Sequence, residues 1–389
     1  MVWLTSLVVC PQTAAAAQKG KRPPAPPFAV LFPPEGAWLV TLPAAPARPA
    51  VRDGVRVIVP LSSGNLVALN WDSGATVWSV PLRATTAPVA AGGLVYVGAG
   101  DTLQALDAAT GTSLWTGHVA GTLEVLAVSA NRLLAVGAGF AHAFDAALGQ
   151  ELWARALPPA GDTTGLAASA TTLYAAHGDG RVIALAIADG RELWVRPIDG
   201  RPSPPLLVGD SLYVGSTGNR FYSLDTRNGQ PRWTWRTGGD VTGAAADAKA
   251  VYYTSLDAVV RAVNPGNGHQ RWKRDLGTRF SVGPIALDGT VLVTGLSILW
   301  ALEPLTAFPW GFLELPGELS GTPLVSDVLT PRRVAMVVVL KDGRAWGFRA
   351  FALQFNEAAP QALAALPGQP LLRERLPAPP VTAPSETGR

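Results

Sequence analysis

Tryptophan recurs at a nearly constant interval along most of this 389-residue chain. Successive members of the series are separated by 40, 37, 38, 41, 39, 39 and 38 residues. The series is Trp38, Trp78, Trp115, Trp153, Trp194, Trp233, Trp272 and Trp310. A period of this length corresponds to one four-stranded blade of a β-propeller. The interval therefore predicts a ring built by repeating one small sheet.

The segment that ends at each tryptophan is itself repeated. Residues 105–115 are ALDAATGTSLW, and residues 223–233 are SLDTRNGQPRW. A tight hairpin needs a residue with positive φ, which glycine adopts without steric cost. We therefore predict a turn at the glycine found four residues before the tryptophan in six copies: Gly74, Gly111, Gly149, Gly190, Gly229 and Gly268. Ala or Ser stands ten residues before the tryptophan, and we expect this small side chain to let a neighbouring indole lie close to the backbone.

Short apolar runs precede each predicted turn. Residues 94–97 and 212–214, for example, are rich in β-branched and aromatic residues and are bounded by glycine, which is typical of strands. A second apolar stretch comes before each of them, so every repeat holds four strands. We predict no helix inside the repeats, because no segment shows a sustained helical apolar period.

The number of blades follows from the two ends of the repeat region. Residues 301–310 form a degraded seventh copy without the turn glycine, and residues 334–348 supply the middle strands of an eighth. Residues 36–42 contain Trp38 but have no strands of their own before them, so we expect them to be the outer strand of the last blade. The prediction is an all-β protein of eight four-stranded antiparallel blades over residues 36–355, closed by its N-terminal strand. Closure removes exposed sheet edges. We interpret all eight tryptophans as structural docking residues between blades.

The segments outside the ring suggest export. Residues 1–17 resemble a partial export signal, with an apolar run at 2–9 and four alanines at 14–17. An alternative is a lipoprotein signal in which Cys10 is lipidated, and a third is no export. Residues 18–35 form a Pro-rich linker, and we expect residues 356–389 to be a largely disordered tail with a short helix within 356–376. With one cysteine, no disulfide can form within the chain.

The sequence offers little recognisable chemistry. Net charge is +3 without a Lys/Arg cluster, so we expect no nucleic-acid partner. The four histidines have no metal-ligand spacing, and we interpret them as surface residues: His118, His142, His177 and His269. Asp107, Asp145 and Asp225 occupy a turn position that other repeats fill with Asn70 or Asn264, which favours turn hydrogen bonding over acid–base catalysis. We predict no catalytic residue, metal or cofactor.

The recurring pattern [AS]-L-D-x-x-[TN]-G-x-x-x-W resembles the tryptophan-docking signature of pyrroloquinoline-quinone-type propeller repeats, over residues 36–355. One branch of that superfamily contains quinone- and calcium-dependent alcohol and glucose dehydrogenases. Those enzymes are longer, many carry adjacent cysteines, and they need Glu, Asn and Asp residues on inserted segments. The other branch is BamB, a lipoprotein scaffold of the machinery that inserts β-barrels into the outer membrane. The compact repeats and single cysteine are more similar to BamB.

This resemblance implies a non-catalytic, monomeric scaffold that binds protein partners. The outer-membrane assembly machinery is one candidate partner. It also implies a location in the periplasm or on the periplasmic face of the outer membrane, with membrane contact only through a lipid anchor. Two alternatives stay open. One is a quinone-dependent dehydrogenase-like or ligand-sensing propeller with its ligand over the central channel. The other is a carbohydrate- or cell-wall-binding module that uses aromatic residues such as Trp71 and Trp235, which could equally pack on neighbouring strands.

Overall fold

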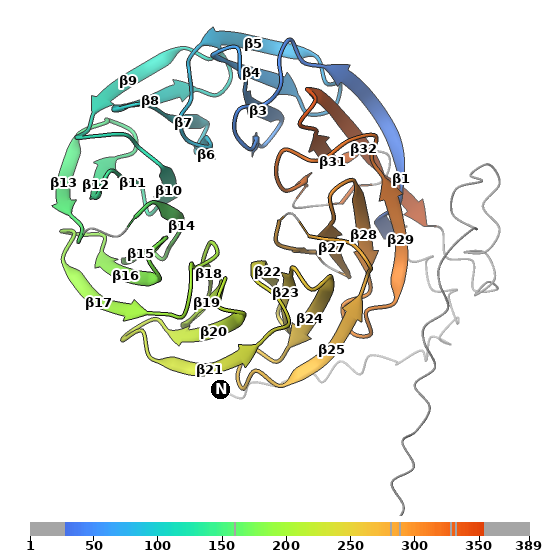
Figure 1. Cartoon of the computed structure of the whole chain (residues 1–389). Helices are drawn as coiled ribbons and strands as arrows, with labels where there is room; N and C mark the ends of the chain where they lie inside the picture. The colour runs from blue at the N-terminus through green and yellow to red at the C-terminus, as the bar shows by residue number, and fades with distance from the viewer. Residues whose placement is uncertain are drawn as a thin grey trace, which may run out of the picture.

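The computed structural model of the chain describes residues 28–353, except 159–160, 281, 288, 327–328 and 331–332. The predicted export signal, Cys10, the first part of the predicted linker and the predicted C-terminal tail lie outside the described residues. The described part forms eight four-stranded sheets arranged as a ring around a central axis (Figure 1). All pairings within these sheets are between neighbouring antiparallel strands, so the prediction of an eight-bladed propeller is confirmed. We find no helix in the described segments that could cross a membrane.

Blades 1 to 4 follow the chain from the innermost strand to the outermost. Their strands are β2 (Val51–Asp53), β3 (Arg56–Pro60), β4 (Asn65–Asn70), β5 (Thr76–Pro81), β6 (Val89–Ala91), β7 (Leu94–Ala99), β8 (Thr102–Asp107), β9 (Ser113–His118), β10 (Val125–Ser129), β11 (Arg132–Gly137), β12 (Phe140–Asp145), β13 (Glu151–Ala156), β14 (Thr163–Ala168), β15 (Thr172–His177), β16 (Arg181–Ala186) and β17 (Glu192–Pro197).

Blades 5 to 7 repeat this order, and blade 8 combines the two ends of the ring. The strands are β18 (Leu206–Val208), β19 (Ser211–Ser216), β20 (Arg220–Asp225), β21 (Pro231–Arg236), β22 (Val241–Ala246), β23 (Val251–Ser255), β24 (Val259–Val263), β25 (Gln270–Asp275), β26 (Ile285–Leu287), β27 (Thr290–Thr294), β28 (Ile298–Leu302) and β29 (Pro309–Glu314), then β30 (Leu324–Val325), β31 (Val334–Val339), β32 (Arg344–Leu353) and β1 (Phe28–Thr41) for blade 8.

The core consists of clusters between neighbouring blades. The second strand of a blade has a sheet on both of its faces, and every residue of β15 and β19 is accordingly buried. Such strands have nearly continuous apolar sequences because neither face meets water. The outermost strands diverge from their neighbours, so most residues of β5 and β25 are exposed, and the docked tryptophan is the one buried residue of each.

The N-terminal strand closes the ring, as predicted. It pairs with β32, placing Trp38 opposite Gly347 and Thr41 opposite Arg344. The predicted start of this strand at residue 36 is wrong, since β1 begins at Phe28, inside the expected linker. The reason is that β32 continues to Leu353 and supplies backbone partners as far as the Phe28–Leu353 pair.

The two faces of the ring differ in the connections that they carry. One face, here called the turn face, holds the turns between first and second strands and between third and fourth strands. The other, the loop face, holds the remaining turns and the links between blades. The docked tryptophans lie near the turn face, because each stands at the start of an outermost strand.

Removing residues 1–41 should destabilise the ring, because blade 8 then loses its outermost strand together with Trp38. Loss of a docked tryptophan alone costs about 3–5 kcal/mol. Removing only residues 1–27 should leave the transition unchanged, since β1 stays intact. Thermal unfolding followed by circular dichroism distinguishes the two, and equal midpoints for both deletions would show that β1 is dispensable.

Candidate functional site

Seven of the eight repeated tryptophans join one blade to the next through the same hydrogen bond. In each, the indole Nε1 donates to the carbonyl directly after the Asp, Asn or equivalent residue that opens the next blade's turn, over 2.8–3.2 Å. The donor and acceptor pairs are Trp38–Trp71, Trp78–Ala108, Trp115–Ala146, Trp153–Ile187, Trp194–Thr226, Trp233–Pro265 and Trp272–Pro304. Because the acceptor belongs to another sheet, each bond fixes the relative position of two blades.

The turn glycines have two roles, of which sequence reasoning found one. All six adopt positive φ, as in Gly190 at 70°. Each also lies under the indole of the preceding blade: a Cβ added at Gly190 would come within 2.7 Å of Trp153 Cε3. A side chain at Gly190 would therefore press against the docked ring, although blade 7 has Ala307 at this position, also with positive φ, and Trp272 still docks there. A close approach also occurs at Gly347, which pairs with Trp38 as the residue ten before the tryptophan does in other blades, because a Cβ added there would clash with the Trp38 indole.

Sequence reasoning missed a tyrosine that accompanies four of the docked indoles. Tyr96 donates its hydroxyl to the Ala146 carbonyl over 3.0 Å, the same acceptor that Trp115 uses. The two rings lie 6.0 Å apart. The same arrangement recurs with the pairs Tyr174–Trp194, Tyr213–Trp233 and Tyr252–Trp272. The available signal was the tyrosine in the apolar run that forms the second strand of these repeats, such as residues 94–97 and 212–214.

Trp310 does not dock, contrary to our prediction for the whole series. It is 48% exposed. The register explains this, because Ala301 pairs with Gly311 where the preceding blade pairs Ala262 with Trp272. The turn of the degraded repeat has the same length as the blade-6 turn, but the tryptophan stands one residue earlier, at the position of Arg271. Its docking partner is also lacking, since β32 and β1 of blade 8 are chain ends and no turn joins them.

Blade 8 and blade 1 are held by two indoles that donate in opposite directions. Trp38 of blade 8 donates to the Trp71 carbonyl, and Trp71 donates to the Val334 carbonyl of blade 8 over 2.8 Å. Trp71 is buried, and the Arg52 guanidinium lies 4.5 Å from its ring. Of the two interpretations left open for Trp71 and Trp235, the structure shows packing: Trp235 is half-buried and donates to the Gly268 carbonyl of the next blade.

The acidic turn residues bind their own turns, as the sequence indicated. Asp107 Oδ1 accepts hydrogen bonds from the amides of Ala109 and Thr110 over 2.9 and 2.8 Å. These bonds stabilise the ionised carboxylate, so they hold the pKa of Asp107 below its ordinary value. The carboxamide oxygens of Asn70 and Asn264 accept the same kind of bond. An Asn can replace an Asp here because the role needs only an acceptor.

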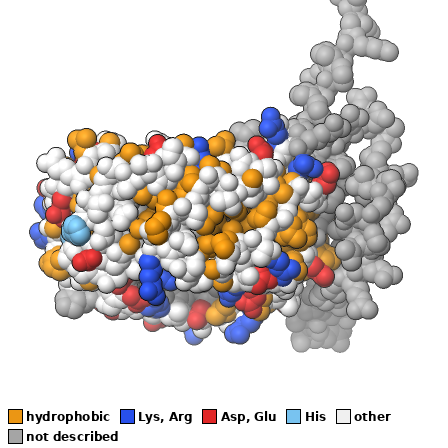
Figure 2. All heavy atoms as spheres, turned by 90° about the horizontal axis from the view of Figure 1, so that it is seen from above, with side chains coloured by type: hydrophobic (Ala, Val, Ile, Leu, Met, Phe, Trp, Pro, Cys, Tyr) orange, Lys and Arg blue, Asp and Glu red, His pale blue; other side chains and the backbone are white. Residues whose placement is uncertain are grey.

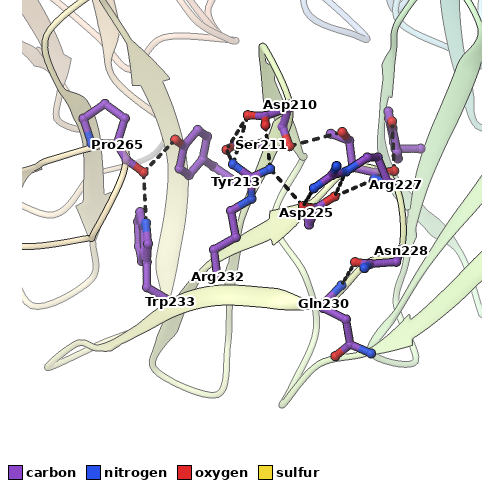
Figure 3. A network of polar contacts seen from close by, with 12 residues as sticks. Asp210, Ser211, Tyr213, Asp225, Arg227, Asn228, Gln230, Arg232, Trp233 and Pro265 are labelled. Carbon is purple, nitrogen blue, oxygen red and sulfur yellow. Dashed lines mark hydrogen bonds and ion pairs between the residues drawn. The ribbon is translucent and has the colours of Figure 1, made fainter.

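Blade 5 adds an ion-pair network around this turn (Figure 3). Arg232 donates to both oxygens of Asp210, over 3.0 and 2.7 Å, and to Asp225 over 2.9 Å. Hydrogen bonds from Arg227 and Arg232 lower the pKa of Asp225. These charges neutralise one another, so the network is suited to holding the turn rather than to transferring protons.

The innermost strands line the axis with small and apolar side chains. Among their described residues, Arg52 and Asp53 of β2 carry the only charges. Arg52 donates to the carbonyls of Gly54 and Val325, so its guanidinium is bonded to the backbone of blades 1 and 8. No group of three His, Cys, Asp or Glu residues placed to hold a metal ion occurs in the described ranges.

Two histidines predicted at the surface are buried. His142 is 3% exposed, and its Nδ1 lies 2.7 Å from Glu151 Oε1. His177, at the loop-face end of β15, is 2% exposed, and neither ring nitrogen has a hydrogen-bond partner in the described part of the chain. Burial lowers the pKa of His177 from its ordinary value of 6.5. Sequence spacing could not show this, because the same place holds Ser216 and Ser255 in later blades.

The outer wall exposes one apolar residue per blade over half of the ring. Val77, Leu114, Leu152 and Leu193 each stand one residue before a docked tryptophan and are 40–54% exposed. Figure 2, the view from above, shows hydrophobic side chains gathered on the wall at the top of Figure 1. In blades 5 and 6 the same position holds Arg232 and Arg271. The wall therefore has an apolar side and a basic side.

Repeated docked tryptophans, four-stranded blades and an N-terminal closing strand define a propeller of the pyrroloquinoline-quinone-like repeat type. Residues 35–234 match the family model described as outer membrane protein assembly factor BamB. The chain belongs to that family.

Similar proteins come from several bacteria. The chain is 29% identical to the outer membrane protein assembly factor BamB of Xanthomonas campestris pv. campestris over 288 residues, covering 64% of this chain and 68% of that protein. It is 24% identical to the tetrathionate hydrolase of Acidithiobacillus ferrooxidans over 272 residues, 60% of this chain and about half (54%) of the hydrolase. The crystal structure of BamB from Moraxella catarrhalis shares the fold, with a TM-score of 0.65 and 18% identity over 81% of this chain and 99% of that one.

Trp115→Ala should lower the free energy of unfolding by about 3–5 kcal/mol, because it removes both the packed indole and its bond to the next blade. Trp310→Ala should change it by less than about 0.5 kcal/mol, because Trp310 is exposed and not docked. Urea denaturation of the two variants measures the difference. Similar losses in both would contradict the assignment of docked and undocked tryptophans.

Acidification should weaken the fold through His177. Its lowered pKa means that the folded state resists protonation, so this contribution to stability is complete above pH 6.5 and is lost as the pH falls below that value. Asp162, Asp179 and Glu124 partly oppose the shift, whereas Arg181 adds to it.

We expect His177→Ser to reduce the drop in melting temperature between pH 8 and pH 5. Serine fits, because Ser216 and Ser255 occupy the same place. His269→Asn, at an exposed position, is the control and should leave the drop unchanged. An unaltered pH dependence in His177→Ser would show that other groups cause it.

Proposed function

We propose that this protein is a non-catalytic scaffold that binds partner proteins during the assembly of outer-membrane proteins. The observation that carries the proposal is the match of residues 35–234 to the BamB family model, together with the likeness to the Xanthomonas assembly factor. The proposal extends to export, a periplasmic location, a monomeric state and attachment to the membrane through Cys10.

The arrangement of polar groups supports a binding role. The indoles, tyrosines and turn carboxylates that the repeats have in common are engaged in bonds within or between blades. What varies from blade to blade is the outer wall, where exposed leucines give way to arginines. A rigid ring with a varied surface suits selective contacts with proteins.

A second candidate function is hydrolysis of tetrathionate, because one relative carries that name. The likeness covers about half of the hydrolase, and that partial coverage makes it the weaker candidate. The few charged side chains on the innermost strands also give little support to a reaction centre at the axis. The same scarcity of charged side chains at the axis weakens the case for a quinone-dependent dehydrogenase.

Photo-crosslinking in living cells tests the scaffold proposal. A photoreactive phenylalanine analogue placed at Leu114, Leu152 or Leu193 samples the apolar side of the wall, and one at Arg271 samples the basic side. We expect at least one position to capture a component of the outer-membrane assembly machinery, identified by mass spectrometry, while others do not. A selective pattern would locate the docking surface.

Two results would contradict the proposal. One is a set of crosslinks from every position that contains no assembly component. The other is catalytic activity in the purified protein, either release of products from tetrathionate or dye reduction with alcohols after addition of quinone and calcium. For any activity found, a blade-joint variant such as Trp115→Ala serves as a control for dependence on the folded ring.

A further inference from the structure

Among the residues whose side chains the structure describes, every exposed Phe, Tyr or Trp lies in blade 7. Phe308 is 60% exposed and Trp310 is 48% exposed, and their rings lie 6.3 Å apart in an edge arrangement. Leu305, in the same turn, is 56% exposed. We call Leu305, Phe308 and Trp310 the blade-7 patch.

Among the described side chains, the exposed pair of aromatic rings is specific to this blade. The strand registers align Leu305, Phe308 and Trp310 with Gly266, His269 and Arg271 of blade 6. Two aromatic rings and a leucine thus stand where the preceding repeat has small, polar or charged residues. The fold does not require them there, because blade 6 forms the same turn without them. Exposed apolar clusters of this kind mark contact sites.

The ends of the ring place a segment of the chain beside this patch. The last described residue, Leu353 of β32, pairs with Phe28 of β1, and β1 contacts β29 of blade 7. Figure 1 shows the arrowhead of β32 lying outside β29. Third strands of the blades run toward the turn face, and the turn that holds Leu305 and Phe308 is on that face. The chain therefore leaves the ring on the side of the patch, at the neighbouring blade.

We infer that residues 356–376 dock on the blade-7 patch. This segment has the sequence NEAAPQALAALPGQPLLRERL, in which Leu363 and Leu366 have the i, i+3 spacing that would place both side chains on one side of a helix. An amphipathic helix that lays leucines on exposed aromatics is a common recognition mode. The connection is short, since Leu363 follows Leu353 by ten residues, which span at most about 33 Å when extended. The segment is also tethered, so docking occurs at a high effective concentration.

Intramolecular crosslinking tests this inference on the full-length protein. With a photoreactive phenylalanine analogue in place of Phe308, irradiation should link position 308 to residues 356–376 of the same chain. The yield should not depend on protein concentration. The same analogue at Leu114, which corresponds to Trp310 in blade 2 and is 54% exposed, should give no such link.

A pair of variants separates docking from simple proximity. Leu363→Asp combined with Leu366→Asp should reduce the crosslink at least fivefold, because charged side chains cannot pack on the patch. Val381→Asp, outside the segment, should leave it unchanged. The inference would be overturned if the crosslinks went only to residues 1–27, or only to another protein. It would also be overturned if they formed only between chains, with a yield that depends on concentration, or if no crosslink formed. Unchanged melting of each variant shows that the ring is intact.

Discussion

The hydrogen bond from an indole in one blade to a turn carbonyl in the next is the interaction on which the rest of this ring depends. It uses three features of the sequence: a tryptophan at the start of the outermost strand, a turn that presents its carbonyl, and a small residue with positive φ beneath the ring, which is glycine in six joints and Ala307 in the seventh. The joint between blades 3 and 4 shows all three, with Trp153, the Ile187 carbonyl and Gly190. Each repeat supplies a donor to one neighbour and an acceptor to the other, so the units form a continuous chain of contacts.

The point where the ring closes is the one place where this rule changes. Blade 8 is assembled from both ends of the chain, and β32 and β1 are not joined by a turn. Blade 7 has no turn to dock on, and in its outer strand Gly311 occupies the place of the docked indole while Trp310 faces outward. On the other side of blade 8, Trp38 and Trp71 bond in opposite directions and strengthen the joint. The irregular repeat is thus a consequence of closure.

Binding remains the function that this architecture favours. The polar groups of the turns are used within the ring, as in the network of Asp210, Arg232 and Asp225 (Figure 3). The outer wall varies between blades and is exposed, whereas the blade-7 patch is the surface for which we infer an occupant from the chain itself. Membership of the BamB family agrees with a protein that presents surfaces to partners.

The sequence by itself determined the class of fold, the number of blades and the closing strand, because spacing and turn residues are local features that repeat. It also indicated that Asp107 and its counterparts serve turns, since an amide can replace a carboxylate there. Only the tertiary structure decided that Trp310 is exposed, that His177 is buried and that tyrosines share the carbonyls of the docked indoles. Those outcomes depend on the position that each residue takes in the strand register and on contacts between different sheets, which no local pattern specifies.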